Sequence, residues 1–411
     1  MLTAVRALAA DLDRAWRRAG YERDAFGELA ADLLDRPLGL DVATLARGVC
    51  GGVELPRQRR LDQGFGQPAI TLHHGERFVV EALCWHTGSP AIHQHAFTGA
   101  FRVVTGRSVH GRYSFTETGR VEPRLAFGDL RLDRVELLDD TVVTAIPFGA
   151  RLVHSAFHLD DPSMTVVVRT HDEGGPEYSY LPPGVAFDPA ARSPALHKRL
   201  QLLDTLHRSS PELYAECVHA AIDGGDLYDA MAAVMRAGGH ALDGATFGSF
   251  VDHLVDRHGP PAEPLVPALA EERRRGALVR LRASLTDADD RHLVACLISF
   301  RDRASLLDQM VRYHGDPAEA RRHLASGVAA VLRVPDKTRG LVALAVSAVV
   351  DDGPADAFPD WAARRSGPPL GADDSVLLAE LYPKLLDHPL LLPLRSEPVP
   401  SAARRRVFPP G

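Results

Sequence analysis

The chain has 411 residues, of which 45% are hydrophobic and 25% are charged, a composition typical of a globular protein with two or three domains. Its formal net charge of -7 argues against nucleic acid as a partner, and no segment reaches the about 18 apolar residues of a membrane helix. Four scattered cysteines and the absence of a signal-peptide pattern favour reduced thiols and a cytoplasmic location.

Apolar residues at helical spacing predict two helices within residues 2–40. Val5, Leu8 and Leu12 lie on one face of the first helix, and Gly20 is expected to end it. A shorter helix and a linker are expected in residues 41–60. Residues 1–60 are therefore interpreted as an N-terminal helical segment.

The period changes to that of strands between residues 62 and 180. His73 and His74 are placed in a turn, and His110 is expected to be structural or exposed. Short strands separated by Gly, Pro and Asp turns favour a double-sheet barrel of jelly-roll type at residues 61–185. The predicted strands cover residues 69–72, 77–85, 100–105, 108–116, 130–138, 141–147, 152–158 and 164–170.

Residues 181–189 are rich in proline and glycine and are predicted to be a linker. Beyond them the pattern is helical, with caps expected at Ser210, Asp243 and Asp316. The charged residues 271–275 are interpreted as a solvated helix face, and the histidines of this part as surface or core residues. Helices are predicted at residues 195–208, 211–222, 226–237, 246–257, 264–285, 287–300, 304–313, 317–332, 341–350 and 375–386.

These elements predict an α+β protein with N-terminal helices, a β-barrel and an α-helical domain at residues 186–396. Residues 397–411, with an arginine run and two prolines near the end, are expected to be a flexible tail. The helical domain could cover the mouth of the barrel, form a homodimer or bind a partner.

Residues 83–106 carry the strongest chemical signal in the chain. His93 and His95 are separated by one residue, so on a strand both imidazoles project from the same face. His154 follows a turn signal at Pro147 and Gly149, which is expected to begin another strand. Three neutral imidazoles suit iron(II), nickel, copper or zinc and leave coordination positions open for a substrate and dioxygen.

This pattern resembles the cupin superfamily and, within it, the cysteine dioxygenase-like thiol dioxygenases. The first cupin motif is matched by Gly88, His93, His95 and Gly106, and the second by Pro147, Gly149 and His154. Gly99 occupies the position of the usual glutamate ligand, and thiol dioxygenases also lack that glutamate. The resemblance covers about residues 60 to 175, and it implies a jelly-roll barrel with three histidines around iron.

The residues expected around the substrate differ from those of the family. Gly99 cannot form the cysteine–tyrosine crosslink of some members, and the strand at residues 69–72 lacks the arginine that binds a carboxylate. The family's Ser-x-His-x-Tyr triplet falls at Val167, Arg169 and His171. We expect Arg169 to bind the substrate carboxylate, with His171 as its hydrogen-bonding partner or as a proton shuttle. The alternative is that Arg169 pairs with an internal carboxylate such as Glu81.

The resemblance implies a non-haem dioxygenase that oxidises a small thiol or amino acid with O2, with Fe(II) as the expected metal and Ni, Cu or Zn as alternatives. Two other functions stay open: a non-catalytic cupin that senses a metal or small ligand, and a three-histidine cupin oxygenase with a non-thiol substrate. The expected partners are a small-molecule substrate and O2, without nucleic acid or membrane.

Overall fold

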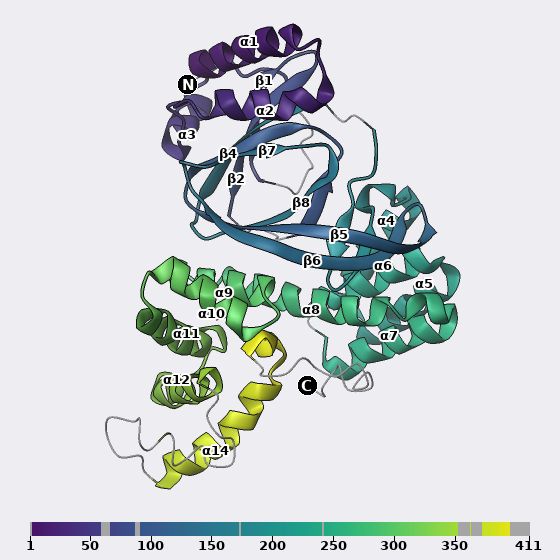
Figure 1. Cartoon of the computed structure of the whole chain (residues 1–411). Coiled ribbons are helices and arrows are strands. Elements are labelled where there is room, and N and C mark those ends of the chain that lie inside the picture. The colour runs from purple at the N-terminus through teal and green to yellow at the C-terminus, as the bar shows by residue number, and fades with distance from the viewer. Residues whose placement is uncertain are drawn as a thin grey trace. The chain divides into compact units, whose positions relative to one another are not determined.

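The computed structural model describes residues 2–58, 66–86, 91–171, 174–240, 242–351, 362 and 372–394 (Figure 1). Gly88 of the predicted motif and the predicted tail lie outside these residues. Two units make up the chain, one formed by Met1–Ala233 with Leu254–Ala268 and the other by Val234–His253 with Leu269–Gly411. The four-part division expected from the sequence remains a prediction.

Three helices precede the first strand: α1 (Leu2–Arg18), α2 (Arg23–Leu34) and α3 (Val42–Cys50). Val5 and Leu12 of α1 are fully buried, as the helical spacing predicts. Gly20 follows α1 with a φ of 66°, a conformation that glycine adopts without steric cost. Asp41 caps α3 by accepting a hydrogen bond of 2.6 Å from the backbone N–H of Thr44. The sequence thus predicted these helices correctly.

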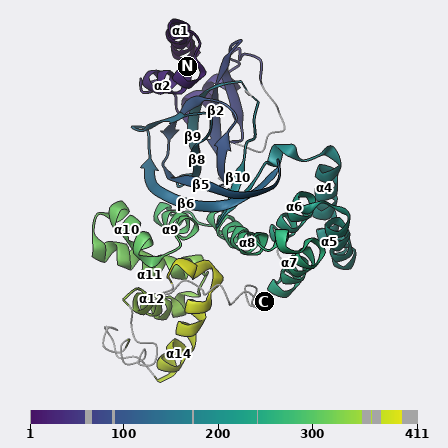
Figure 2. The ribbon, with the colours of Figure 1, turned by 45° about the vertical axis from the view of Figure 1, so that its right-hand side comes forward.

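The strands form two antiparallel sheets, here together called the barrel (Figure 2). The first sheet has the order β1-β2-β9-β4-β7, and the second closes on itself in the order β10-β11-β6-β5-β8-β3. This confirms the predicted α+β class with a jelly-roll region. The strands are β1 (Ala69–His74), β2 (Phe78–Trp85), β3 (Ile92–His95), β4 (Gly99–Thr105), β5 (Ser108–Glu122), β6 (Leu125–Leu138), β7 (Val143–Ile146), β8 (Gly149–His158), β9 (Ser163–Thr170), β10 (Ser179–Leu181) and β11 (Val185–Phe187).

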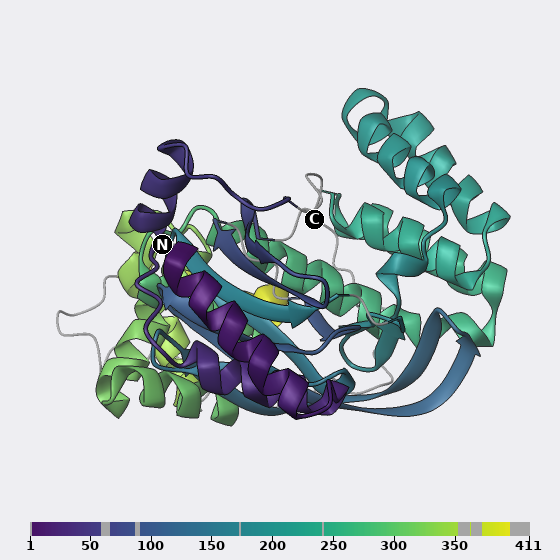
Figure 3. The same cartoon turned by 90° about the horizontal axis from the view of Figure 1, so that it is seen from above.

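Alternation along β9 separates two hydrophobic clusters. Val166 and Val168 pack in one cluster with the apolar faces of α1 and α2, which lie across the outer side of the first sheet (Figure 3). Val167 belongs to the other cluster, between the two sheets, together with Phe101 of β4 and Leu152 of β8. Val167 and the residues two positions before and after it therefore face the interior of the barrel.

Two local predictions in the barrel are wrong. His73 and His74 are the last residues of β1, and the turn begins at Gly75. The expected linker instead contains the last residue of β10 and all of β11, and these two strands pair with each other and join β3 to β6. Each of these strands has three residues. Such a length is too short to show a clear alternation of apolar and polar residues.

The helices after the barrel follow the predicted order. Asp243 and Asp316 cap α7 and α11 by accepting bonds from the backbone N–H groups of Thr246 and Glu319, at 2.8 and 2.7 Å. The helices are α4 (Pro194–Ser209), α5 (Pro211–Gly224), α6 (Leu227–Gly238), α7 (Gly244–His258), α8 (Leu265–Arg282), α9 (Ala288–Ser299), α10 (Arg303–His314), α11 (Pro317–Val331), α12 (Asp336–Val350) and α14 (Ala372–Asp387). None of the helices in the described residues is both long and apolar enough to cross a membrane.

The charged segment at residues 271–275 is not a solvated face, as the sequence was interpreted. Arg274 and Arg275 are buried, and their Nη1 atoms donate to the carbonyls of Leu297 and Ile298, each at 3.0 Å. These carbonyls belong to the last turn of α9, where backbone acceptors have no partner within the helix. The two arginines therefore satisfy the end of α9.

Candidate metal centre

The barrel brings the three predicted ligands together. β3 and β8 are neighbours, with His93 directly opposite His154, and one ligand atom from each of His93, His95 and His154 lies within 4.8 Å of the others. His95 and His154 are buried, and their Nε2 atoms are 2.9 Å apart. Gly149, opposite His95, has a φ of 70°, which explains why the Pro-x-Gly signal begins this strand with glycine.

Each of the three imidazoles is held in its neutral form. Burial lowers the pKa of His93 and brings the pKa values of His95 and His154 well below the ordinary value. Neighbouring positive groups add to the effect, with Arg169 acting on His95 and Arg112 on His154. A neutral imidazole keeps a nitrogen lone pair, which is the form that binds a metal ion.

The hydrogen bonds of these imidazole rings are made through Nδ1 in His93 and His154, and the Nε2 atoms of His95 and His154 face each other. Nδ1 of His93 donates to the carbonyl of Ala91 at 3.0 Å, so the lone pair of His93 is on Nε2. Two nitrogens bound to one ion at about 2.0–2.1 Å lie on the order of 3 Å apart, close to the separation of the His95 and His154 atoms. The residues present therefore fit a divalent transition-metal ion.

His110 of β5 supports this centre and was not recognised in the sequence. Its ring is fully buried, and its Nε2 lies 2.8 Å from Nδ1 of His154. Nδ1 of His110 is 3.9 Å from Oε1 of Glu136, which forms an ion pair with Arg112. Burial and the nearby arginines lower the pKa of His110 to about 3. A hydrogen bond to the second nitrogen of a ligating histidine fixes its orientation and tautomer.

Aromatic rings form one wall of the centre. The ring of Phe97 lies 4.5 Å from that of His95, and the ring of Phe101 lies 5.8 Å from that of His154. Apolar rings at this distance limit water around the imidazoles and lower the local dielectric constant. The sequence assigned no role to either phenylalanine.

Arg169 lies on the inner face of β9, where the sequence predicted it, and it pairs with Glu81. Its Nε donates to Oε2 of Glu81 at 3.1 Å, with side-chain exposures of 12% and 10%. The guanidinium carbon also lies 4.7 Å from the centre of the Phe97 ring, on which it stacks. The pairing with an internal carboxylate, the alternative to substrate binding, is thus present.

His171 lies just beyond the end of β9. Its Nε2 donates to the carbonyl of Gly75 at 3.1 Å, and its ring is 5.5 Å from that of His74. These contacts connect His171 to the turn between β1 and β2. They do not connect it to the three clustered histidines.

Gly99, which replaces the usual glutamate of the family pattern, has a steric role in β4. A Cβ atom on Gly99 would lie 2.2 Å from the carbonyl oxygen of Val168 and 2.9 Å from Cα of Arg169. Any side chain here would push β4 away from β9. A glutamate therefore does not fit at this position without a shift of the two strands.

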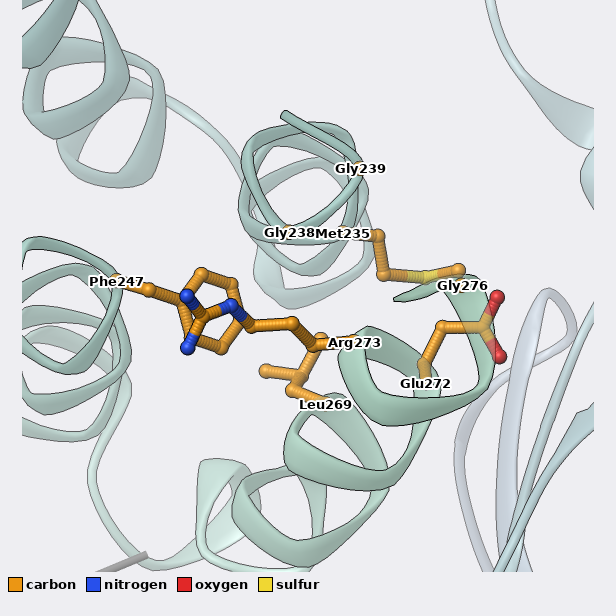
Figure 4. Close-up of a pocket in the computed structure, with 8 residues that line it drawn as sticks. All are labelled: Met235, Gly238, Gly239, Phe247, Leu269, Glu272, Arg273 and Gly276. Carbon is orange, nitrogen blue, oxygen red and sulfur yellow. The ribbon is translucent and has the colours of Figure 1, made fainter. Parts of the chain in front are cut away.

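A cavity also lies within the second unit, beside α6, α7 and α8 (Figure 4). Its volume of about 60 Å³ has room for a few water molecules and is far smaller than the hundreds of Å³ typical of ligand pockets. Burial raises the pKa of Glu272 at its edge, while Arg273 stacks on Phe247 at 5.0 Å. The lining residues are Met235, Gly238, Gly239, Phe247, Leu269, Glu272, Arg273 and Gly276.

Comparison with known proteins adds little to the geometry. No family model matches the sequence, and no curated protein matches it. One similar solved structure is described as "Structural and spectroscopic insights into the mechanism of oxalate oxidase", with 14% identity, 43% of this chain and 83% of that chain covered, and a TM-score of 0.21. A likeness this distant carries no argument about this chain. The barrel and its three-histidine cluster agree with what the resemblance noted in the sequence implies.

Proposed function

We propose that this protein is a metal-dependent cupin oxygenase that oxidises a small thiol or amino acid, cysteine-like in size, with O2. The observation that supports the proposal most directly is the convergence of His93, His95 and His154 within 4.8 Å between the two sheets of the barrel. Three protein nitrogens on one side of an ion leave positions for both a substrate and dioxygen.

Iron(II) is the metal that we propose, and nickel, copper and zinc accept the same nitrogen donors. When bound, iron would supply the redox chemistry that oxygen activation requires, whereas zinc has no redox chemistry of its own. The protein contributes the number and geometry of the ligands. His110 holds the ring of His154 in place through the 2.8 Å contact, and Phe97 and Phe101 restrict water.

Arg169 supplies a positive charge near His95 and is the residue that we propose for the carboxylate of the substrate. Glu81 already occupies one edge of its guanidinium at 3.1 Å. A substrate carboxylate would therefore share or replace this partner when it binds. A planar guanidinium can hold two carboxylate oxygens through parallel hydrogen bonds, which would orient the substrate.

A second candidate is a three-histidine cupin oxygenase whose substrate is not a thiol. The pairing of Arg169 with Glu81 favours it, because an arginine with an internal partner is less available for an amino-acid carboxylate. The position of His171 beside Gly75 favours it as well, since it leaves the expected polar triplet of the thiol dioxygenases unmatched. A non-catalytic metal or ligand sensor with the same barrel is the remaining alternative.

The test begins with anaerobic purification and metal analysis of the full-length protein, followed by an oxygen-electrode screen of thiols and amino acids. The variants His93→Ala, His95→Ala and His154→Ala should each lose one equivalent of metal and all oxygen uptake. His86→Ala is the matched control, because His86 is exposed and pairs with Asp161.

The product mass distinguishes the candidates. Two added oxygen atoms on a thiol support a thiol dioxygenase, and oxidation of a non-thiol supports the second candidate. Metal binding without oxygen uptake on any substrate supports a sensor. Unchanged metal content in all three histidine variants would contradict the proposal as a whole.

A further inference from the structure

Three side chains from three different helices converge in the second unit of the chain. Asp289 of α9, His314 of α10 and His323 of α11 each place one ligand atom within 4.8 Å of the others. We propose that these residues form a second metal site, separate from the barrel, that binds a divalent transition-metal ion such as Zn²⁺. The inference does not depend on the function proposed for the barrel.

Local structure explains how residues distant in sequence reach one place. α10 ends at His314 because Gly315 follows with a φ of 77°, in the left-handed region. Asp316 and Pro317 then begin α11, which packs against both α9 and α10 and carries His323 in its second turn. The turn therefore brings His314 and His323 side by side, facing the start of α9.

His314 has a nitrogen ready to bind an ion. Its Nε2 is buried and has no hydrogen-bond partner among the residues that the structure describes. Leaving such a buried polar atom unsatisfied costs free energy, so a bound partner such as a metal ion is expected there. Burial and the nearby His323 also lower the pKa of His314, which favours the neutral ligand form.

His323 has a carboxylate near each of its ring nitrogens. Its Nδ1 is 3.9 Å from Oδ2 of Asp289, and its Nε2 is 3.8 Å from Oε1 of Glu319. An ion between Nδ1 and Oδ2 would leave the Nε2 N–H directed toward Glu319. Ligating histidines in metalloproteins commonly have such a carboxylate partner for the second ring nitrogen.

Asp289 is positioned in the same way. The hydroxyl of Tyr313 donates to its Oδ1 at 3.1 Å, which leaves Oδ2 directed toward His323. The rings of His314 and His323 are stacked with centroids 4.2 Å apart and an angle of 6° between their planes. Because the lone pair of an imidazole nitrogen lies in the plane of its ring, binding both nitrogens to one ion requires one of these rings to turn out of the stacked arrangement.

The surrounding charge favours a cation. Asp287 caps α9, and Asp290 lies beside Asp289 in its first turn. Burial, followed by the proximity of Asp287 and Asp289, raises the pKa of Asp290, as expected where negative charge is concentrated. These carboxylates outweigh the partial positive charge of the α9 N-terminus, and the C-terminal end of α10 at His314 adds partial negative charge.

The donor set defines the class of ion. Two imidazole nitrogens and one carboxylate oxygen suit zinc, iron or cobalt, whereas magnesium and calcium prefer oxygen ligands. Three protein ligands leave a fourth position for water. An ion here would link α9, α10 and α11, in addition to the hydrogen bond from Tyr313 of α10 to Asp289 of α9.

The experiment measures the zinc content of the full-length protein after equilibration with Zn²⁺ and dialysis against metal-free buffer. In the background His93→Ala/His95→Ala/His154→Ala, which lacks the barrel ligands, we expect one zinc per chain. Adding Asp289→Asn, His314→Gln or His323→Gln should remove it. His253→Gln, on a half-buried histidine of α7 outside the cluster, should leave it bound.

If the barrel variant does not fold, the same substitutions in the otherwise unchanged chain should reduce the zinc content by one equivalent. Asp289→Asn is nearly isosteric and keeps the hydrogen bond to Tyr313, so it separates loss of metal from loss of structure. A full zinc content in the Asp289→Asn/His314→Gln/His323→Gln variant would overturn the proposal. So would the absence of any zinc in a folded barrel variant with the helical residues intact.

Discussion

Nε2 of His110 lies 2.8 Å from Nδ1 of His154, inside the barrel and out of contact with water. His110 comes from β5 and His154 from β8, which are adjacent strands of the second sheet. A ligand of the candidate metal centre therefore has a fixed ring orientation before any ion binds. His110 is a positioning residue, since it acts through His154.

The variant His110→Phe should weaken metal binding without removing a ligand. Loss of such an outer hydrogen bond typically reduces metal affinity about 10–100-fold. Competition with a chelator of known affinity measures the change. The control is His158→Gln, because His158 is also buried on β8 but bonds to Ser108. Equal losses in both variants would show a general effect on the barrel.

The metal-free protein should lose stability as the pH falls below about 6.5. Burial lowers the pKa of His110 to about 3, and the pKa values of His95 and His154 are lowered in the same direction. Between these values and 6.5 the unfolded chain binds protons that the folded chain does not, so acid favours unfolding. For His110 this contribution is about 1.4 kcal/mol per pH unit between about pH 3 and 6.5.

Urea unfolding at pH 7.5, 6.0 and 5.0 measures this dependence. The stabilising contribution is fully present above the unfolded pKa and is lost progressively toward pH 3 for His110. The slope of the unfolding free energy against pH is set by the number of protons taken up on unfolding. In His110→Phe that number should fall by about one. The same slope in this variant and in the wild type would contradict the pKa assignment.

Arg169→Met should destabilise the protein by about 3–5 kcal/mol, because it leaves the nearly buried carboxylate of Glu81 without its guanidinium partner. Glu81→Gln/Arg169→Met should recover most of that loss, which a double-mutant cycle by urea unfolding measures. If Arg169 also binds substrate, Arg169→Lys should raise the apparent KM with metal content unchanged. If the KM of that variant equals that of the wild type, Arg169 pairs with Glu81 and does not bind the substrate.

Gly99→Ala should cost about 2 kcal/mol or more, since its Cβ would lie 2.2 Å from the carbonyl oxygen of Val168. Gly99→Glu should destabilise the barrel further and should not add a metal ligand. Thermal unfolding compares these variants with Gly119→Ala in β5, where nothing lies within 4 Å of the added atom. Equal stability of the Gly99 and Gly119 variants would contradict this account.

The sequence predicted the parts of the centre that depend on local periodicity. His93 and His95 share a face because strand side chains alternate, and Gly149 marks the start of the strand that carries His154. The helices of the second unit were also predictable from their spacing and from caps such as Asp316. Each of these signals lies within a few residues of the feature that it predicts.

The features of the site that the sequence did not predict depend on how segments distant in sequence pack against each other. The contact between His110 and His154 requires the register of β5 on β8, which a single strand pattern does not contain. The pairing of Arg169 with Glu81 requires the register of β9 on β2, so the sequence left two alternatives. The approach of His314 and His323 to Asp289 follows from helix packing and was not predicted.

The helices α1 and α2 are part of the folding unit of the barrel, since Val80, Val166 and Val168 share one cluster with Leu12 and Phe26. β9 thus directs Met164, Val166 and Val168 toward these helices. A chain shortened to begin at residue 66 would present the outer side of the first sheet to water as a continuous apolar surface, of the kind that drives chains to associate. The first forty residues therefore cover this surface, and their removal should promote association of the chain without changing any of the three clustered histidines.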